Sequence, residues 1–367
     1  MPNYKFDFGI GDGPADGYIQ VLPDTLYDSG LGYGFLPGAR IGSRDRREAS
    51  RLKGAFCIPM DAEFVVDLPD GCYHVAVTVG DAIAPTLTSL QYGQRRFAFH
   101  QASTLAGQYA VHSFTAKATG GQLRLRFSGI APRINTLDIA EAPEAVTVYL
   151  AGDSTVTDQE TFPYAGWGQM LPLYFKAEIA IDNRARSGRS SRSFMAEGRL
   201  DAILKEIKAG DHLWIQFGHN DQKPDEARAT EPFGSYKEML ATYVGEARAR
   251  NAVPVLITPP HRRKFDGNGR IVDTHGDYLN AMKELALELD VPVIDLAAKS
   301  RALYEELGDE SSKELFVWAL PGEYMAFPDG ARDDTHFHEL GAVRIAGLVA
   351  EGVRAQLGHL PISLYLK

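Results

Sequence analysis

The hydrophobic pattern of this chain changes near residue 146, and the change divides the sequence into two parts of different fold class. Before it, short β-rich segments alternate with turns of Gly, Pro and Asp, and helical periodicity is almost absent. The clearest segments span residues 63–67, 72–79, 95–100, 109–115 and 122–127. This spacing predicts an all-β sandwich or jelly roll over residues 1–140, followed by a linker at residues 141–145.

From residue 146 onward, apolar runs alternate with amphipathic stretches. Runs typical of buried strands occur at residues 146–151, 179–181, 213–217, 253–257 and 291–294. Between them, apolar residues recur at helical spacing, as in Leu200, Ile203, Leu204 and Ile207. Repeated strand and helix order predicts an α/β domain over residues 146–367, in which helices cover both faces of a parallel sheet.

Composition narrows the possible partners. The formal net charge of −10 provides no general attraction for nucleic acid or anionic lipid, so neither is predicted as a partner. No stretch approaches the roughly 18 apolar residues that span a bilayer, and the first residues lack the apolar core of a signal peptide. These features favour a cytoplasmic, non-membrane protein. An exported protein whose signal peptide has been removed would show the same sequence features. The oligomeric state stays open.

Polar residues follow the predicted strands at positions where a sheet of this kind binds ligands. Ser154 follows the first strand, Gly188 lies in the loop after the second, and Asn220 lies after the third. A serine hydroxyl needs a base and an orienting carboxylate, and near the end of the chain His336 and Asp333 are of those types. The backbone N–H groups of Ser154 and Gly188 and the side-chain amide of Asn220 are the donor types that stabilise an oxyanion.

Several of these residues have other interpretations. Gly-Asp-Ser by itself is more typical of a turn or helix cap, and Asp334 also precedes His336 closely enough to be its partner. We expect Asp153 to order its loop through backbone N–H groups, and His219 to support the loop that carries Asn220. His336 and His338 lack a third ligand at suitable spacing, so no catalytic metal is predicted. Of the two kinds of metal site, a structural cation in the β-domain is favoured over a catalytic metal.

In their order along the chain, these blocks resemble the SGNH or GDSL hydrolase superfamily. Within it, the segments around Gly152-Asp153-Ser154, Gly166-Trp167-Gly168, Ser187-Gly188-Arg189 and Gly218-His219-Asn220-Asp221 are similar to rhamnogalacturonan acetylesterases of carbohydrate esterase family twelve. The front segment, with Lys5-Phe6-Asp7-Phe8-Gly9, resembles the galactose-binding-like β-domain that precedes some bacterial members. The resemblance implies a flavodoxin-like three-layer sheet in the second part, and no cofactor.

Carried over by position, the resemblance implies Ser154 as nucleophile, His336 as base and Asp333 as its partner. Ser154, Gly188 and Asn220 then form the oxyanion hole. The Asp-x-x-His spacing of the family selects Asp333 over Asp334.

The function expected from the resemblance is a carbohydrate O-acetylesterase that removes acetyl groups from pectic, rhamnogalacturonan-type oligosaccharides. Basic residues in the loops suit a carboxylated sugar, with solvated loop charge as the alternative; for the sugar, we expect contacts from Arg189, His261 and Arg332. The alternatives are an esterase for other acyl groups, such as acetylxylan or short lipid esters, and a carbohydrate-binding protein without catalysis.

Overall fold

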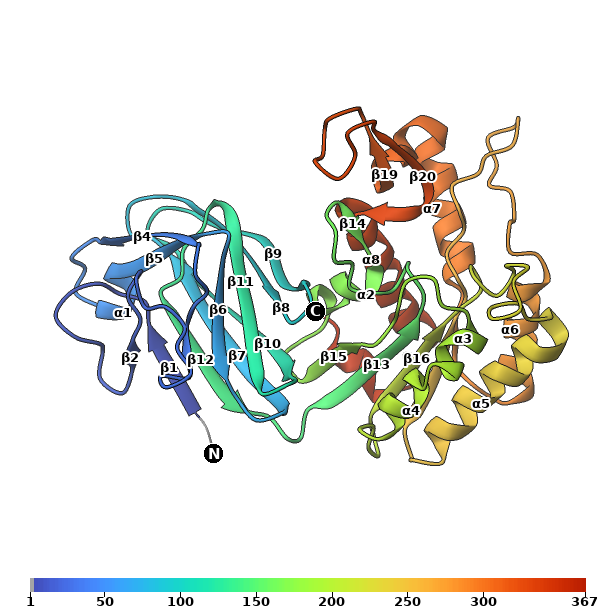
Figure 1. Cartoon of the computed structure of the whole chain (residues 1–367), viewed down its shortest axis with the longest axis horizontal. Helices are drawn as coiled ribbons and strands as arrows, with labels where there is room; N and C mark the ends of the chain where they lie inside the picture. Colours follow the sequence, from blue (N-terminus) through green and yellow to red (C-terminus); the bar gives the residue numbers. More distant parts are fainter. Residues whose placement is uncertain (1–2) are drawn as a thin grey trace. The chain divides into compact units, whose positions relative to one another are not determined.

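The computed structural model describes residues 3–367 (Figure 1), which form two compact units. The first unit contains the residues up to Ala145 and the short segment Phe175–Ala180. The second contains Val146–Tyr174 and Ile181–Lys367.

The first unit is the all-β sandwich that the sequence predicts. Its elements are β1 (Asn3–Asp7), β2 (Ile19–Gln20), β3 (Tyr33–Phe35), β4 (Arg40–Asp45), α1 (Arg51–Gly54), β5 (Ala55–Met60), β6 (Ala62–Asp67), β7 (Gly71–Gly80), β8 (Thr86–Tyr92), β9 (Arg96–Thr104), β10 (Tyr109–Ala118), β11 (Gln122–Ala131) and β12 (Thr136–Glu141). One sheet has the order β10-β7-β12-β1-β2, and the other has the order β3-β6-β11-β8-β9. Val75 and Val77 of β7 and Phe64 of β6 share one core, so the two sheets pack face to face.

The second unit contains the parallel sheet. Its elements are β13 (Val146–Gly152), β14 (Tyr164–Ala165), α2 (Trp167–Met170), η1 (Leu171–Tyr174), β15 (Ile179–Asn183), α3 (Ser191–Ala196), α4 (Arg199–Leu204), β16 (His212–Gln216), η2 (Pro232–Tyr236), α5 (Lys237–Arg248), β17 (Val253–Ile257), α6 (Asp277–Glu288), β18 (Val293–Ile294), α7 (Leu296–Ser311), η3 (Ser312–Leu315), β19 (Phe316–Ala319), β20 (Ala331–His338), α8 (Glu339–Gln356) and η4 (Pro361–Tyr365). The strand order β15-β13-β16-β17-β18 is second, first, third, fourth and fifth along the chain, as in flavodoxin-like folds.

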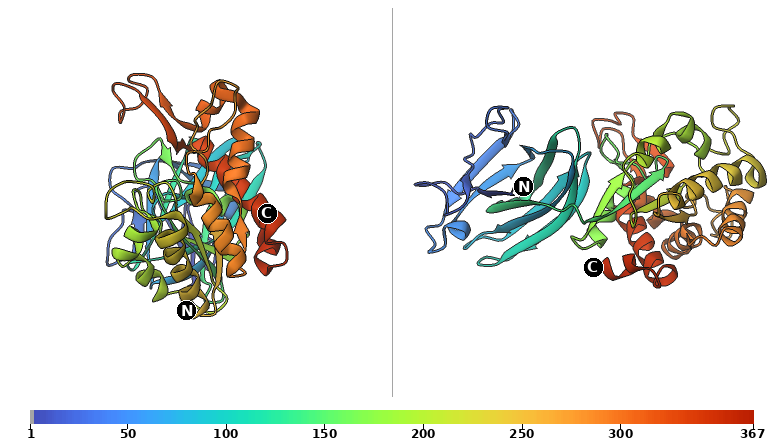
Figure 2. Two further views of the ribbon diagram at one scale, coloured as in Figure 1. Left: turned by 90° about the vertical axis from the view of Figure 1, so that its right-hand side faces the viewer. Right: turned by 90° about the horizontal axis from the view of Figure 1, so that it is seen from below.

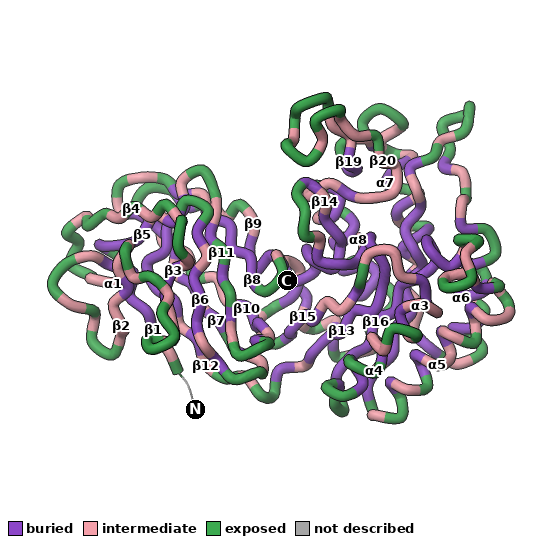
Figure 3. Tube along the Cα trace, in the orientation of Figure 1, coloured by how far each residue is buried: buried purple, intermediate pink, exposed green. Residues whose placement is uncertain are grey.

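Helices cover both faces of this sheet, and its strands are buried along most of their length (Figure 3). Tyr149 and Ala151 of β13 share a core with α3, α4, α5 and α6. Leu150, which points the other way, lies where a side chain on Gly168 of α2 would touch it. On that side α8 packs against α2 and α7, and the yellow-green and orange-red helices lie on opposite sides of the strands (Figure 2).

A small antiparallel sheet of order β14-β20-β19 was not predicted from the sequence. Strand β20 carries both Asp333 and His336. The strand is interrupted there, because consecutive residues Phe316 and Val317 of β19 pair with Phe337 and Asp333. Residues 334–336 therefore form a bulge, which bends the strand locally.

Candidate active site

The predicted catalytic residues meet at the carboxyl edge of the parallel sheet. Ser154 follows β13 and Asn220 follows β16, and these two strands are neighbours in the sheet. The strand order reverses between them, which is the point where flavodoxin-like folds bind their ligands. Strand β20 brings Asp333 and His336 to the same edge from the far end of the chain.

Ser154, His336 and Asp333 form one hydrogen-bonded series. The Ser154 Oγ atom lies 2.8 Å from His336 Nε2, and His336 Nδ1 lies 2.7 Å from Asp333 Oδ2. An ionised carboxylate can only accept, so the imidazole donates from Nδ1 and its Nε2 accepts the proton of the serine hydroxyl. Ser154 is 8% exposed, which shields the hydroxyl from most of the solvent. This arrangement can deprotonate Ser154 as it attacks an ester.

The bulge in β20 keeps Asp333 ionised. Its Oδ1 atom accepts hydrogen bonds from the backbone N–H groups of Thr335 and His336, at 2.8 and 2.9 Å. Burial raises the pKa of the Asp333 carboxyl, but the hydrogen bonds and the charge of His336 outweigh it, so the pKa lies below its usual range.

Asp334, the other carboxylate near His336, is directed elsewhere. Its Oδ1 atom accepts from Arg263 Nη1 at 2.6 Å and from Trp318 Nε1 at 2.9 Å. In addition, the Arg263 backbone N–H donates to the Asp334 carbonyl oxygen at 2.8 Å. The Arg263 guanidinium is itself buried and also contacts Asp309 and Ser312. Asp334 therefore anchors β20 to the loop after β17.

Hydrogen bonds hold the loops that carry the expected oxyanion donors. Asn220 Nδ2 donates to the Arg189 carbonyl oxygen at 3.1 Å, which ties the loop after β16 to the residue next to Gly188. Gln159 Nε2 donates to the Ser154 carbonyl oxygen at 2.6 Å. Gly188 has φ +80°, a conformation that favours glycine. Within residues 3–367, the N–H groups of Ser154 and Gly188 have no hydrogen-bond acceptor, so both remain available to a ligand.

A second buried pair fixes the nucleophile loop to the oxyanion loop. Asp153 Oδ1 accepts from the backbone N–H and the hydroxyl of Thr155, at 2.9 and 2.8 Å. Its Oδ2 atom lies 3.2 Å from His219 Nδ1, and His219 precedes Asn220. Burial raises the pKa of Asp153, but the contacts from His219 and Thr155 hold it below its usual range. These are the loop-ordering and supporting positions expected for Asp153 and His219.

A cavity of about 460 Å³ opens beside these loops, within the range typical of small-molecule sites. Segments after β13 and β15 and the connection between β19 and β20 contribute to it. Its wall combines the rings of Tyr164 and Phe327, whose centroids are 5.5 Å apart, with the side chains of Arg186 and Arg189. Both arginines form partly exposed ion pairs, with Glu160 and Glu197 respectively, and such pairs are weak enough for a ligand carboxylate to compete.

The structure separates the three residues expected to contact the sugar. Arg189 lines the cavity described above. Arg332 lines a different cavity, beside Trp318. His261 is 2% exposed and lies in the interior, where burial lowers its pKa to about 4. This histidine does not reach the surface, where a sugar would contact it.

Sequence reasoning missed two residues that contact the candidate triad. The Tyr164 ring meets the His336 ring edge to face, with centroids 5.8 Å apart, and Gln159 binds the Ser154 carbonyl oxygen. Tyr164 reaches His336 because its strand pairs with the end of β20, at His338. No periodic pattern in the sequence indicates this long-range pairing.

Neither a metal site nor a membrane span is found in residues 3–367. No group of three or more His, Cys, Asp or Glu side chains there is arranged to hold a metal ion. None of the helices in that range is long and apolar enough to cross a bilayer.

Known proteins resemble both units. A model of the GDSL-like lipase/acylhydrolase family matches residues 150–342, and a galactose-binding domain-like model of beta-agarase and YXIM esterase type matches residues 4–129. The rhamnogalacturonan acetylesterase RhgT of Bacillus subtilis (strain 168) is 51% identical over 223 residues, which are 60% of this chain and 94% of RhgT. The uncharacterized esterase YxiM of the same organism is 30% identical over 372 residues, covering 96% of this chain and 91% of YxiM.

The crystal structure of the Bacillus subtilis YxiM protein is also similar, with a TM-score of 0.54 and 29% sequence identity. The similarity covers 98% of this chain and 100% of that one. With a family model that matches more than half of its residues, the chain belongs to the GDSL-like lipase/acylhydrolase family and is a carboxylic ester hydrolase.

Proposed function

We propose that this protein is a carbohydrate O-acetylesterase that removes acetyl groups from pectic, rhamnogalacturonan-type oligosaccharides. The observation that carries the chemistry is the series of hydrogen bonds from Ser154 through His336 to Asp333. The substrate class is supported by the similarity to a named rhamnogalacturonan acetylesterase, which extends over 94% of that relative. The cavity lined by Gln159, which binds the Ser154 carbonyl oxygen, presents two arginines and two aromatic rings that can contact an acidic sugar.

In the proposed mechanism, His336 Nε2 takes the proton of Ser154 while Oγ attacks the acetyl carbonyl carbon. The carbonyl oxygen becomes an oxyanion, which accepts hydrogen bonds from the N–H groups of Ser154 and Gly188 and from the amide of Asn220. Collapse of this intermediate breaks the ester bond, and His336 returns the proton to the departing sugar oxygen. Water, deprotonated by the same histidine, then attacks the acetyl-enzyme and releases acetate. Asp333 holds the ring and stabilises its protonated form throughout.

A panel of substrates tests this function. Acetate release is measured on acetylated rhamnogalacturonan, acetylated homogalacturonan and acetylated xylan fragments, together with p-nitrophenyl esters of increasing acyl length. We expect the highest kcat/KM on a pectic substrate and a preference for acetyl over longer acyl groups. A higher kcat/KM on xylan than on either pectic polymer would overturn the substrate assignment.

Loss of the Asn220 amide should slow turnover strongly. We expect Asn220→Ala to lower kcat by on the order of 10²–10³, the effect measured for other side-chain oxyanion donors. KM should change little, because the donor acts mainly on the transition state. The matched control is Asn268→Ala, at an exposed loop position outside the site. Equal kcat in the Asn220 and Asn268 variants would remove Asn220 from the oxyanion hole.

A further inference from the structure

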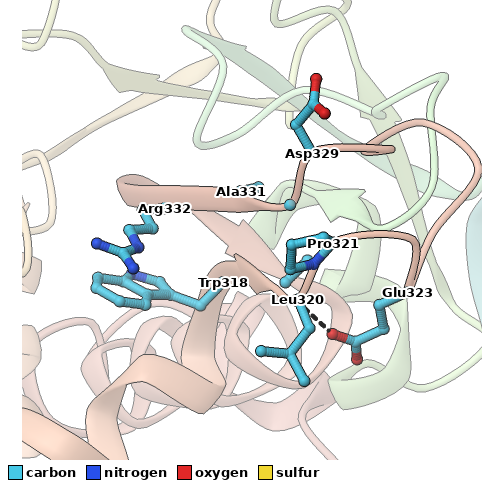
Figure 4. Close-up of a pocket in the computed structure, with 9 residues that line it drawn as sticks. Trp318, Leu320, Pro321, Glu323, Asp329, Ala331 and Arg332 are labelled. Carbon is cyan, nitrogen blue, oxygen red and sulfur yellow. Dashed lines mark hydrogen bonds between the residues drawn. The ribbon is translucent and has the colours of Figure 1, made fainter.

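A second cavity, of about 520 Å³, lies beside strands β19 and β20 (Figure 4). None of the proposed catalytic residues lines it. The residues that line it include Trp318, Leu320, Glu323, Asp329 and Arg332. The mechanism proposed above assigns no role to this cavity.

The Trp318 indole is a fixed wall of this cavity. Its Nε1 atom donates to Asp334, and the Arg263 guanidinium and the Lys313 ammonium lie 5.1 and 4.7 Å from the ring centroid. Arg263 and Lys313 each have a carboxylate partner of their own. A half-buried aromatic ring held in this way provides contact surface without further loss of side-chain freedom on binding.

Arg332 differs from the other two cations at this ring. It pairs with Trp318 across β19 and β20, and its guanidinium lies beside the indole, 5.8 Å from the ring centroid. Within residues 3–367 it forms no ion pair, and its side chain is exposed. An arginine held over an aromatic ring, with its N–H groups free, is suited to bidentate recognition of a carboxylate. The Glu323 carboxylate also lines the cavity; its Oε2 atom accepts from the Leu320 N–H at 2.8 Å, and the group can accept a further hydrogen bond from a sugar hydroxyl.

The cavity is directly connected to the catalytic strand. Arg332 precedes Asp333, and successive side chains of a strand point to opposite faces. Asp333 turns to His336, while Arg332 faces the cavity beside Trp318. The connection between β19 and β20 contributes Leu320 to this cavity, and it contributes Ala326 and Phe327 to the cavity beside Ser154. The same connection therefore borders both cavities.

We propose that the cavity beside Trp318 is a second subsite, which binds an acidic sugar residue of the same chain whose acetyl group lies at Ser154. Arg332 pairs with the carboxylate of that residue, and Trp318 packs against its ring. The inference rests on the proposed function and adds to it: the enzyme selects oligosaccharides long enough to span both cavities, rather than single acetylated sugars.

The experiment compares wild type with Arg332→Gln and with the control Arg344→Gln, which removes an exposed arginine of α8 that lines neither cavity. Two measurements are made on each protein. The first is kcat/KM for acetate release from acetylated oligogalacturonates of two to six residues and from p-nitrophenyl acetate. The second is calorimetric binding of the deacetylated oligogalacturonates, with xylo-oligosaccharides of equal length as the neutral comparison.

We expect kcat/KM of the wild type to rise with chain length. Arg332→Gln should lower kcat/KM on the longest oligogalacturonates roughly 3- to 10-fold, between the effects of an exposed ion pair and of a charge-assisted hydrogen bond. Activity on p-nitrophenyl acetate should be unchanged, and added salt should reduce the difference between the two proteins. Binding of deacetylated oligogalacturonates should weaken by the same factor, while Arg344→Gln behaves as wild type.

Equal binding of oligogalacturonates by the Arg332 and Arg344 variants would overturn the subsite. A parallel loss on p-nitrophenyl acetate would also overturn it, since the substitution would then act through Asp333 and His336. Binding that depends on Arg332, without acetate release from any acetylated glycan, would support the subsite and contradict the proposed esterase function.

Discussion

Replacement of Ser154 with alanine is expected to lower kcat for acetate release by about 10⁶, the loss found when the nucleophile of a serine hydrolase is removed. The size of the effect follows from the geometry. Oγ lies 2.8 Å from His336 Nε2, and once Oγ is removed the oxyanion donors can assist only the direct attack of water on the ester. Acetate release and burst kinetics with p-nitrophenyl acetate measure both the turnover and the acetyl-enzyme.

The matched control for this prediction is Ser187→Ala. Ser187 lines the cavity beside the candidate triad and its Oγ lies 3.5 Å from Gln159, but it makes no contact with His336. We expect this variant to keep most of its turnover and its burst. Binding of a deacetylated oligosaccharide should survive in Ser154→Ala, because the substitution removes one atom from a loop that is held by Asp153 and Gln159. A Ser154→Ala protein that still shows a burst would contradict the assignment of the nucleophile.

Hydrophobic periodicity predicted the parallel sheet well, because each of its strands is buried on both faces and leaves a continuous apolar run. Residues 253–257, for instance, coincide with β17 as predicted. The three-stranded sheet of β14, β20 and β19 left no such signal. Its strands are short or partly exposed, and β14 pairs with residues far along the chain. Register of this kind depends on tertiary contacts that a single sequence does not display.

The sequence also does not show which basic residues near the site already have carboxylate partners. The sequence shows Arg184, Arg189, Arg263 and Arg332 as equivalent positive charges in loops. In the structure, Arg184 is paired with Asp182 and Glu206, and Arg263 is buried against Asp309 and Asp334. Only a fold can show which cations are already satisfied, since the partners lie up to dozens of residues away. Arg332 differs from Arg263 in this respect, although both lie beside Trp318.

The second prediction with a large expected effect on kcat concerns the adjacent carboxylates of Asp333 and Asp334. We expect Asp333→Asn to lower kcat by about 10⁴, the effect known when the orienting aspartate of such a triad becomes an amide. The amide can present an N–H group to His336 Nδ1, which favours the wrong tautomer and leaves Nε2 unable to accept the Ser154 proton. Asp334→Asn should cost less than about tenfold, because the amide oxygen still accepts from Arg263 and Trp318 and the bulge keeps its shape. Acetate release at saturating substrate measures both.

Stability as a function of pH provides an independent check on the same pair. The folded pKa of Asp333 lies below its unfolded value, because the hydrogen bonds and charge of His336 outweigh burial. Its ionisation therefore stabilises the fold fully above the unfolded pKa of about 4, and this contribution is lost as the pH falls through the folded value. The free energies of unfolding of wild type and Asp333→Asn, measured with denaturant, should differ most near neutral pH and converge toward pH 3.

A larger loss of kcat in Asp334→Asn than in Asp333→Asn would show that the bulge rearranges in solution and that Asp334 is the orienting residue.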